Sequence, residues 1–307
     1  DKMALGNNII ALMGVRASKE VAPAAWVRMW ARSFALKGNF EKVEDEALTG
    51  SRVAEPGFIG SVAYTGEIAE TLNRSSLKLL EVAGFTASID ATKKYYKLEN
   101  DVTGWADFIK YHTDTKLKEF YEKARINSIN LEIANRSFIG ITWGIEALEG
   151  RRTLNVANLT EVPTGYVASE KVKSLDTIIK VNGTDKSAVV KSMGVTISNN
   201  LDTENYGFGS KYRKDLDVSD SCSIDFESTI TYDNSNSEYD TYMTALENNT
   251  SIVLEVVLGG VTLKLANCLL KDVSAPVSSK GKIELSISGT CHNSGVTEAV
   301  IFEHLIA

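Results

Sequence analysis

The sequence contains few of the residues that build metal sites, disulfides or nucleophilic centres. Its 307 residues include three cysteines, Cys222, Cys268 and Cys291, and no two of them form a CxxC pair. Neither a disulfide framework nor a zinc site is therefore expected, and free thiols suit a reducing cytoplasm. The three histidines do not share the spacing of metal ligands, so we expect no metal and no cofactor.

Long hydrophobic runs are also missing. The longest apolar run near the start of the chain covers residues 9–15, which is too short to cross a bilayer and is not laid out like a signal peptide. The sequence therefore predicts a soluble protein with no membrane anchor.

None of the common catalytic or nucleotide-binding motifs occurs. The sequence has no GxGxxG, Walker, HExxH or GxSxG pattern, and carboxylate pairs such as Asp45 and Glu46 lie in polar runs without a neighbouring histidine. We therefore expect a protein that is not an enzyme. Tryptophan and arginine alternate from Trp26 to Arg32, a pattern compatible with a nucleic-acid stacking platform or with packed cation–π pairs.

Positive charge is too scarce for a nucleic-acid coat. Lys and Arg number 33 against 40 Asp and Glu, which gives a net charge of −7 and a pI of about 5.2. Residues 151–307 hold most of the negative charge, with 14 basic and 20 acidic side chains against 19 and 20 in residues 1–150. Bulk attraction of a polyanion is therefore not expected.

Alternating apolar and polar residues dominate the chain and predict a mainly β fold. The hydrophobic fraction of 43% and the length are typical of a globular protein of about two domains. Pro163-Thr164-Gly165 is the best candidate linker, so we divide the chain into residues 1–150, a linker at 151–165, and residues 166–307. The clearest strands cover residues 27–34, 126–133, 139–145, 251–257, 261–265 and 282–288.

Turn and helix signals are short. Gly259-Gly260 predicts a tight hairpin between two strands. Apolar residues at helical spacing predict two helices of about ten residues, one from Ser75 and one from Ser237. Helices of this length need a sheet beneath them to be stable.

The two halves of the chain present the same order of features, which predicts an internal duplication. Residues 33–39 lead into a long polar loop, and residues 192–198 do the same. A strand and a short helix follow each loop. Residues 124–132 then match residues 266–274 in position and pattern.

Four segments, at residues 34–52, 60–68, 79–85 and 268–290, carry a resemblance to a known family. In their combination and order they resemble the phage tail tube proteins, the subunits whose stacked rings form the channel of a bacteriophage tail. The resemblance implies two tandem β-sandwich or barrel-like domains, each with a short flanking α-helix and a long stacking loop. It also implies a structural virion protein of the tail, assembled in the host cytoplasm, with tape measure, tail terminator and baseplate proteins as partners.

One acidic strand suits the wall of such a channel. In residues 224–227, Ile224 and Phe226 would pack inward while Asp225 and Glu227 would face outward. Carboxylates on a lumen repel DNA phosphates, so double-stranded DNA would pass without specific binding. A solvated outer sheet face explains the same pattern, and the sequence leaves both interpretations open.

The long loop at residues 40–60 is acidic near its start, and the one at residues 199–219 has a basic stretch before Asp215 and Asp217; opposite charge at these stretches suits axial stacking of rings. Mobile solvated loops are the alternative. The candidate stacking residues are Glu41, Glu44, Asp45, Glu46 and Arg52 in the first loop and Lys211, Arg213 and Lys214 in the second. We predict that changing Glu44, Asp45 and Glu46 to lysine gives a folded subunit that no longer polymerises; normal tubes from this variant would contradict the prediction.

The duplication bears on the size of the ring. If each half supplies one tube domain, three chains form a pseudo-hexameric ring; if only one half lines the channel, six chains are needed. The length of the chain favours a long non-contractile tail, because subunits of contractile tails and type VI secretion tubes are usually smaller. The alternative function is an immunoglobulin-like β-sandwich that decorates a surface or binds a receptor.

Overall fold

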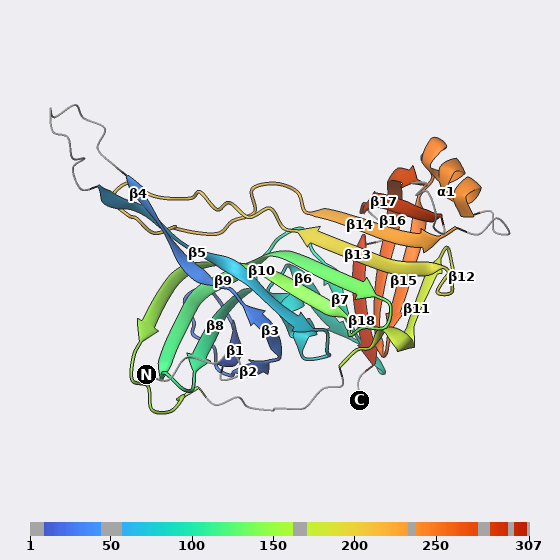
Figure 1. Cartoon of the computed structure of the whole chain (residues 1–307). Coiled ribbons are helices and arrows are strands. Elements are labelled where there is room, and N and C mark those ends of the chain that lie inside the picture. The colour runs from blue at the N-terminus through green and yellow to red at the C-terminus, as the bar shows by residue number, and fades with distance from the viewer. Residues whose placement is uncertain are drawn as a thin grey trace.

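The architecture comes from a computed structural model, which describes residues 9–43, 57–161, 171–232, 238–275, 283–293 and 298–305. Strands hold 61% of the described residues and helices 7%, which confirms the mainly β prediction. The described strands form one 18-stranded sheet, and Figure 1 shows the two halves of the chain side by side in it.

The first half contains strands β1 to β10 and the 3₁₀ helix η2. Alternation explains its longest strand, β9, in which Ile129, Leu131 and Ile133 are buried while Asn130 and Glu132 between them are exposed. The bounds are β1 Ile9–Arg16, β2 Val27–Met29, β3 Ala31–Phe34, β4 Lys37–Val43, β5 Phe58–Thr71, η2 Ser76–Glu81, β6 Phe85–Ile89, β7 Lys93–Leu98, β8 Trp105–His112, β9 Leu117–Ala134 and β10 Gly140–Thr153.

The second half contains strands β11 to β18 and one α-helix. Gly259 and Gly260, with φ of 50° and 97°, form the predicted hairpin between β15 and β16, because both positions need left-handed backbone. The bounds are η3 Ser174–Asp176, β11 Thr177–Val181, β12 Thr184–Asp185, β13 Val190–Ser198, β14 Ser223–Thr231, α1 Glu238–Glu247, β15 Ile252–Leu258, β16 Val261–Ser274, β17 Glu284–Cys291 and β18 Val300–Leu305.

Both halves pair their strands in the same order. The first half runs β1-β8-β9-β10-β5-β4, and the second runs β11-β15-β16-β17-β14-β13. Irregularities recur as well: Lys123 of β9 and Asn267 of β16 have φ of 53° and 51°, each inside a bulge against the preceding strand. Lys123 therefore corresponds to Asn267. This alignment of β9 with β16 differs by two residues from the expected match of residues 124–132 with residues 266–274.

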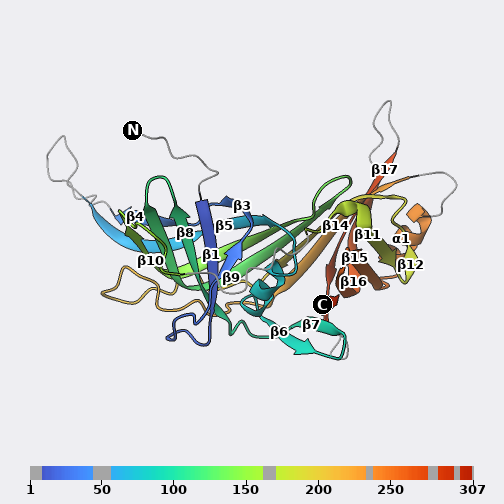
Figure 2. The same ribbon diagram turned by 90° about the horizontal axis from the view of Figure 1, so that it is seen from below.

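The two halves are also joined to each other. β9 continues past β8 and pairs with β13 through residues 128–134, and β18 pairs with β7. Figure 2 shows the β6–β7 hairpin below the sheet, close to the C-terminal strands. One continuous hydrophobic cluster contains buried residues from both halves. The division into residues 1–150 and 166–307 stays a prediction, since the described strands form a single sheet.

The helix expected from Ser75 differs in type from the prediction. It is the 3₁₀ helix η2, which ends with the N–H of Val82 donating to the carbonyl of Leu79 at 3.0 Å. Its leucines, Leu77, Leu79 and Leu80, are all fully buried, while Lys78 is exposed and Glu81, three residues later, is half-buried. The second expected helix is α1; Ser237 lies outside the described residues.

Two further expectations need correction. The strand expected at residues 27–34 is two strands, because β2 pairs with β1 whereas β3 pairs with β5. The loop expected at residues 40–60 is shorter, because β4 continues to Val43 and β5 begins at Phe58, and these strands pair as a hairpin.

Candidate functional site

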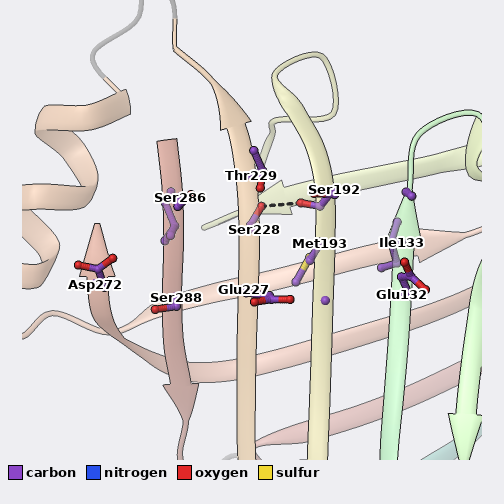
Figure 3. A pocket seen from close by; sticks show the side chains of 13 residues that line it. Glu132, Ile133, Ser192, Met193, Glu227, Ser228, Thr229, Asp272, Ser286 and Ser288 are labelled. Atoms are coloured by element: carbon purple, nitrogen blue, oxygen red, sulfur yellow. Dashed lines mark hydrogen bonds between the residues drawn. The ribbon is translucent and has the colours of Figure 1, made fainter. Parts of the chain in front are cut away.

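One face of the sheet is largely polar and crosses both halves, although Thr71 at its end is buried and the guanidinium of Arg32 lies over Gly140. Its strands lie in the order β16, β17, β14, β13, β9, β10 and β5. One row of directly paired residues crosses all seven strands: Asp272, Ser288, Glu227, Gly194, Glu132, Gly140 and Thr71. Figure 3 shows Asp272, Ser288, Glu227 and Glu132 along this row. We call the surface around this row the polar face.

Between the carboxylates, the polar face contains mainly glycine and other residues with small side chains. A Cβ atom at Gly194 would lie 3.1 Å from Oε1 of Glu227, and one at Gly144 would lie 2.2 Å from Oγ of Ser128. The glycines therefore leave room for the neighbouring polar side chains. Serine and threonine occupy most other positions, and they present hydroxyls to solvent.

Negative charge on the polar face is largely uncompensated. Asp225 forms an ion pair with Lys271, with 2.8 Å between Oδ1 and Nζ. The other four carboxylates, on Glu67, Glu132, Glu227 and Asp272, form no ion pair within the described part of the chain. Along the row, successive carboxylates are two strands apart, which is about 10 Å. The face therefore presents a repeated negative charge.

Sequence alternation placed two of these residues. Ile224 and Phe226 are buried as expected, while Asp225 and Glu227 lie on the opposite side of β14. Glu67, Glu132 and Asp272 were not foreseen. Each precedes a buried residue in its own strand, but only the pairing of distant strands brings them onto one face with Glu227.

Glu67 is the counterpart of Glu227 in the first half. Glu67 of β5 pairs with Gly144 of β10, and Glu227 of β14 pairs with Ser288 of β17. β10 and β17 hold the same place in the two pairing orders. The two halves thus present a glutamate at the same position.

Strands β4 and β5 form an arm that extends beyond the sheet (Figure 1). Glu41, one of the expected stacking residues, is exposed on β4 and accepts a hydrogen bond from Oγ of Ser61 at 2.7 Å. The other expected residues of this loop, Glu44, Asp45, Glu46 and Arg52, lie outside the described residues. The arm also exposes apolar side chains, which are Phe40 (56%), Val43 (44%), Phe58 (68%) and Ile59 (41%).

The loop at residues 199–219 folds back over the first half, where it runs toward the arm (Figure 1). Leu201 and Leu216 pack against Val102, Trp105 and Leu148. The amide of Asn199 donates to the carbonyls of Ala83 and Ile126 at 3.0 and 2.8 Å. The loop is therefore held by buried contacts near its two ends, while residues 208–212 in its middle are exposed.

The expected basic residues of this loop have different surroundings. Arg213 pairs with Glu146 at 2.6 Å, with only 6% and 12% of the two side chains exposed. Burial lowers the pKa of the guanidinium, but the hydrogen bond and charge of Glu146 outweigh it and raise the pKa overall. Lys211 and Lys214 have exposed side chains, although the carbonyl of Lys211 accepts a hydrogen bond from Val62 at 2.7 Å.

Other kinds of site have little support in the described ranges. Within them, no three His, Cys, Asp or Glu residues are grouped to hold a metal ion. In the same ranges no helix has both the length and the apolar character needed to cross a membrane. Arg28 lies 5.8 Å from the ring centroid of Trp30, which fits the cation–π interpretation of the tryptophan–arginine pattern.

Comparison with known proteins identifies the family. The family model for phage tail tube proteins matches residues 6–291, nearly the whole chain, and the chain belongs to this family. A search of curated proteins finds no match. Membership indicates a structural component of the virion tail that assembles into a tube.

Proposed function

From its membership of the phage tail tube family, we propose that this chain is the major tail tube subunit, and that its stacked rings form the DNA-conducting channel of a long non-contractile tail. The observation that carries the proposal is the polar face, which crosses both halves and holds four carboxylates, on Glu67, Glu132, Glu227 and Asp272, that form no ion pair with a described residue. We assign this face, with Asp225 and Glu227 among its residues, to the lumen.

The charge of the polar face suits passage rather than binding. DNA phosphates are repelled by a wall of carboxylates, which outnumber cations at this face such as Lys271 beside Asp225 and Arg32 over Gly140. Double-stranded DNA would therefore move through without specific contacts. The net charge of −7 on the whole chain acts in the same direction.

We propose a ring of three chains. The recurrence of one pairing order in both halves supports this number, because three chains would then present six equivalent units around the channel. A ring of six chains is the alternative, and it would leave only one half of each chain on the lumen.

We propose that the arm and the loop at residues 199–219 make contacts between stacked rings. Glu41, Glu44, Asp45, Glu46 and Arg52 would act on one side, with Lys211 and Lys214 on the other. Arg213 serves mainly to fix the loop, since its charge is paired with Glu146 inside the chain. At the ends of the tube, the tape measure, tail terminator and baseplate proteins would be the partners, after assembly in the host cytoplasm.

Electron microscopy of the purified protein at high concentration tests the function. We expect tubes or rings, and the number of chains in each ring decides between three and six. Monomers that bind a glycan or a cell surface would instead support the immunoglobulin-like decoration or receptor-binding module.

A further inference from the structure

We propose that the junction between β9 and β13 inside the chain is repeated between chains: the outer edge of β3 and β4 in one copy pairs with the outer edge of β16 in a second copy. This inference rests on the proposed function and names the surfaces by which the ring closes.

Strands β3 and β4 hold in the first half the place that β13 holds in the second. Ser33 pairs with Ala69 of β5 directly after a bulge, and Ser192 pairs with Thr229 of β14 directly after a bulge. This register is the one expected from the match of residues 33–39 with 192–198. β13 uses its other edge to pair with β9, whereas the same edge of β3 and β4 pairs with no described strand.

Strand β16 likewise holds the place of β9. β9 pairs with β8 as far as Ala124, and its edge beyond that point is taken by β13 from Ser128 onward. β16 pairs with β15 as far as Cys268, and the corresponding edge beyond it, from Asp272 to Ala275, pairs with no strand in the described part of the chain. Asp272 corresponds to Ser128, because each resumes pairing with the next strand after a bulge.

The internal junction fixes the register of the junction between copies. In β13 and β9 the antiparallel partners are Val195↔Leu131, Thr196↔Asn130, Ile197↔Ile129 and Ser198↔Ser128. The corresponding partners between copies are Leu36↔Ala275, Lys37↔Ser274, Gly38↔Val273 and Asn39↔Asp272. This pairing would continue the polar face from one copy into the next.

The two edges are complementary in charge, and no described strand pairs with either of them, although α1 contacts β16. Lys37 and Asp272 are both exposed, and they would be diagonal neighbours across the junction, within reach of an ion pair. The carbonyl of Leu36 accepts a hydrogen bond from the hydroxyl of Tyr121 at 2.7 Å, and it keeps a second lone pair for a strand partner. Unpaired edges of this kind favour association with another strand.

The arm supports the same direction of assembly. The loop that follows β13 covers the first half through Leu201 and Leu216. The arm follows β3 in the same way, and its exposed Phe40 and Phe58 find no such cover within the described part of the chain. A second copy placed by the proposed junction would bring its second half beneath the arm.

Cysteine cross-linking tests the proposed register between β4 of one copy and β16 of the next. In a Cys222→Ser background, Lys37→Cys combined with Ser274→Cys would place two thiols opposite each other on different copies. Mild oxidation of assembled tubes should then give covalent multiples of the chain on a non-reducing gel. Thr196→Cys combined with Asn130→Cys is the matched control, since it places the same pair within one chain and should form a disulfide without any increase in mass.

The possible outcomes distinguish failure of the proposed junction from failure of the proposed function. Tubes that yield only single chains from the Lys37→Cys and Ser274→Cys pair, while the control closes its disulfide, would overturn the junction and leave the proposed function standing. A wild-type protein that stays monomeric at high concentration would overturn both.

Charge reversal provides a second measurement that does not depend on oxidation. Lys37→Glu and Asp272→Lys should each raise the protein concentration needed for tube formation by about two- to fivefold, and the double variant should restore it. Both positions are exposed, so the subunit should stay folded. A double variant no better than the single variants would overturn the proposed register.

Discussion

Glu70 is a carboxyl group buried in the interior of the first half. It is 2% exposed, and Nε1 of Trp143 donates to its Oε1 at 2.9 Å. Burial raises the pKa of Glu70, and the hydrogen bonds that it accepts reduce this effect only in part. The folded protein therefore holds this proton to a higher pH than the unfolded chain does.

This difference makes stability depend on pH. Between the pKa of Glu70 in the unfolded chain and its higher pKa in the fold, the folded state binds more protons, so the free energy of unfolding falls as pH rises. Glu70→Gln removes the titrating group, and its stability relative to wild type should increase with pH above the ordinary range of glutamate. Urea unfolding at a series of pH values measures this. Glu67→Gln, on the exposed side of the same strand, is the control and should show no such trend.

Cys268 and Cys291 form a pair that the sequence did not suggest. They are directly opposite in β16 and β17, both buried, with 2.7 Å between their sulfur atoms. The hydrogen bond between the two thiols, together with burial, raises the pKa of Cys291, so the thiolate is disfavoured and oxidation should be slow.

We expect diamide to convert this pair slowly into a disulfide. The two thiols would lose two protons and two electrons to the diazene, which becomes the hydrazine. The bond closes a loop between neighbouring strands and should raise the free energy of unfolding by up to about 3 kcal/mol. Mass spectrometry of the peptides and urea unfolding would show both effects. The Cys291→Ser variant should show neither, and a disulfide involving Cys222 instead would contradict the prediction.

At the scale of elements, the loop at residues 199–219 depends on the buried pair of Arg213 and Glu146. Arg213→Ala would leave the Glu146 carboxylate without its cation, and we expect it to destabilise the protein by about 2 to 3 kcal/mol. Urea unfolding measures the loss, and limited proteolysis should detect faster cleavage within the loop. Lys211→Ala removes an exposed lysine of the same loop and should change stability by less than about 0.5 kcal/mol. Equal effects of the two substitutions would contradict a structural role for Arg213.

The elements that the sequence predicts well are those set by local chemistry. The hairpin at Gly259-Gly260 could be predicted because two adjacent residues with positive φ specify the turn. Ile224 and Phe226 were placed inward because alternation is a property of one strand. The match of residues 33–39 with 192–198 holds in the pairing register, because Ser33 and Ser192 each resume pairing directly after a bulge.

The elements that the sequence misses depend on distant partners. η2 is a 3₁₀ helix because tertiary packing buries its leucines from several sides. Glu132 belongs to the polar face only because β9 extends beyond β8 and receives β13. The sequence suggests Arg213 as a stacking residue, but in the fold it forms an ion pair with Glu146, which is far away in the chain. Sequence periodicity contains no information about such pairings.

At the scale of the whole molecule, the junction between β13 and β9 inside the chain has the same form as the contact that we propose between chains. The two halves meet through β13 and β9, and the equivalent edges of β3, β4 and β16 pair with no described strand. Repetition of one contact inside and between chains allows a ring to close without a second kind of interface. The continuity of the polar face follows from the same contact, since paired strands align their outward side chains.

The charge of the polar face leads to the last prediction, which concerns DNA. Changing Glu132 and Glu227 to lysine reverses the charge of two residues in the central row without altering the buried side of β9 or β14. We expect the variant to form tubes that retain short double-stranded DNA at low salt and release it as salt is raised, whereas wild-type tubes retain none. Co-sedimentation of DNA with tubes over a salt series measures this. Glu99→Lys with Asp101→Lys is the matched control, because both residues are exposed in the connection between β7 and β8, away from the polar face. Equal retention of DNA by the control would show that net charge alone attracts DNA, and the assignment of the polar face to the lumen would then fail.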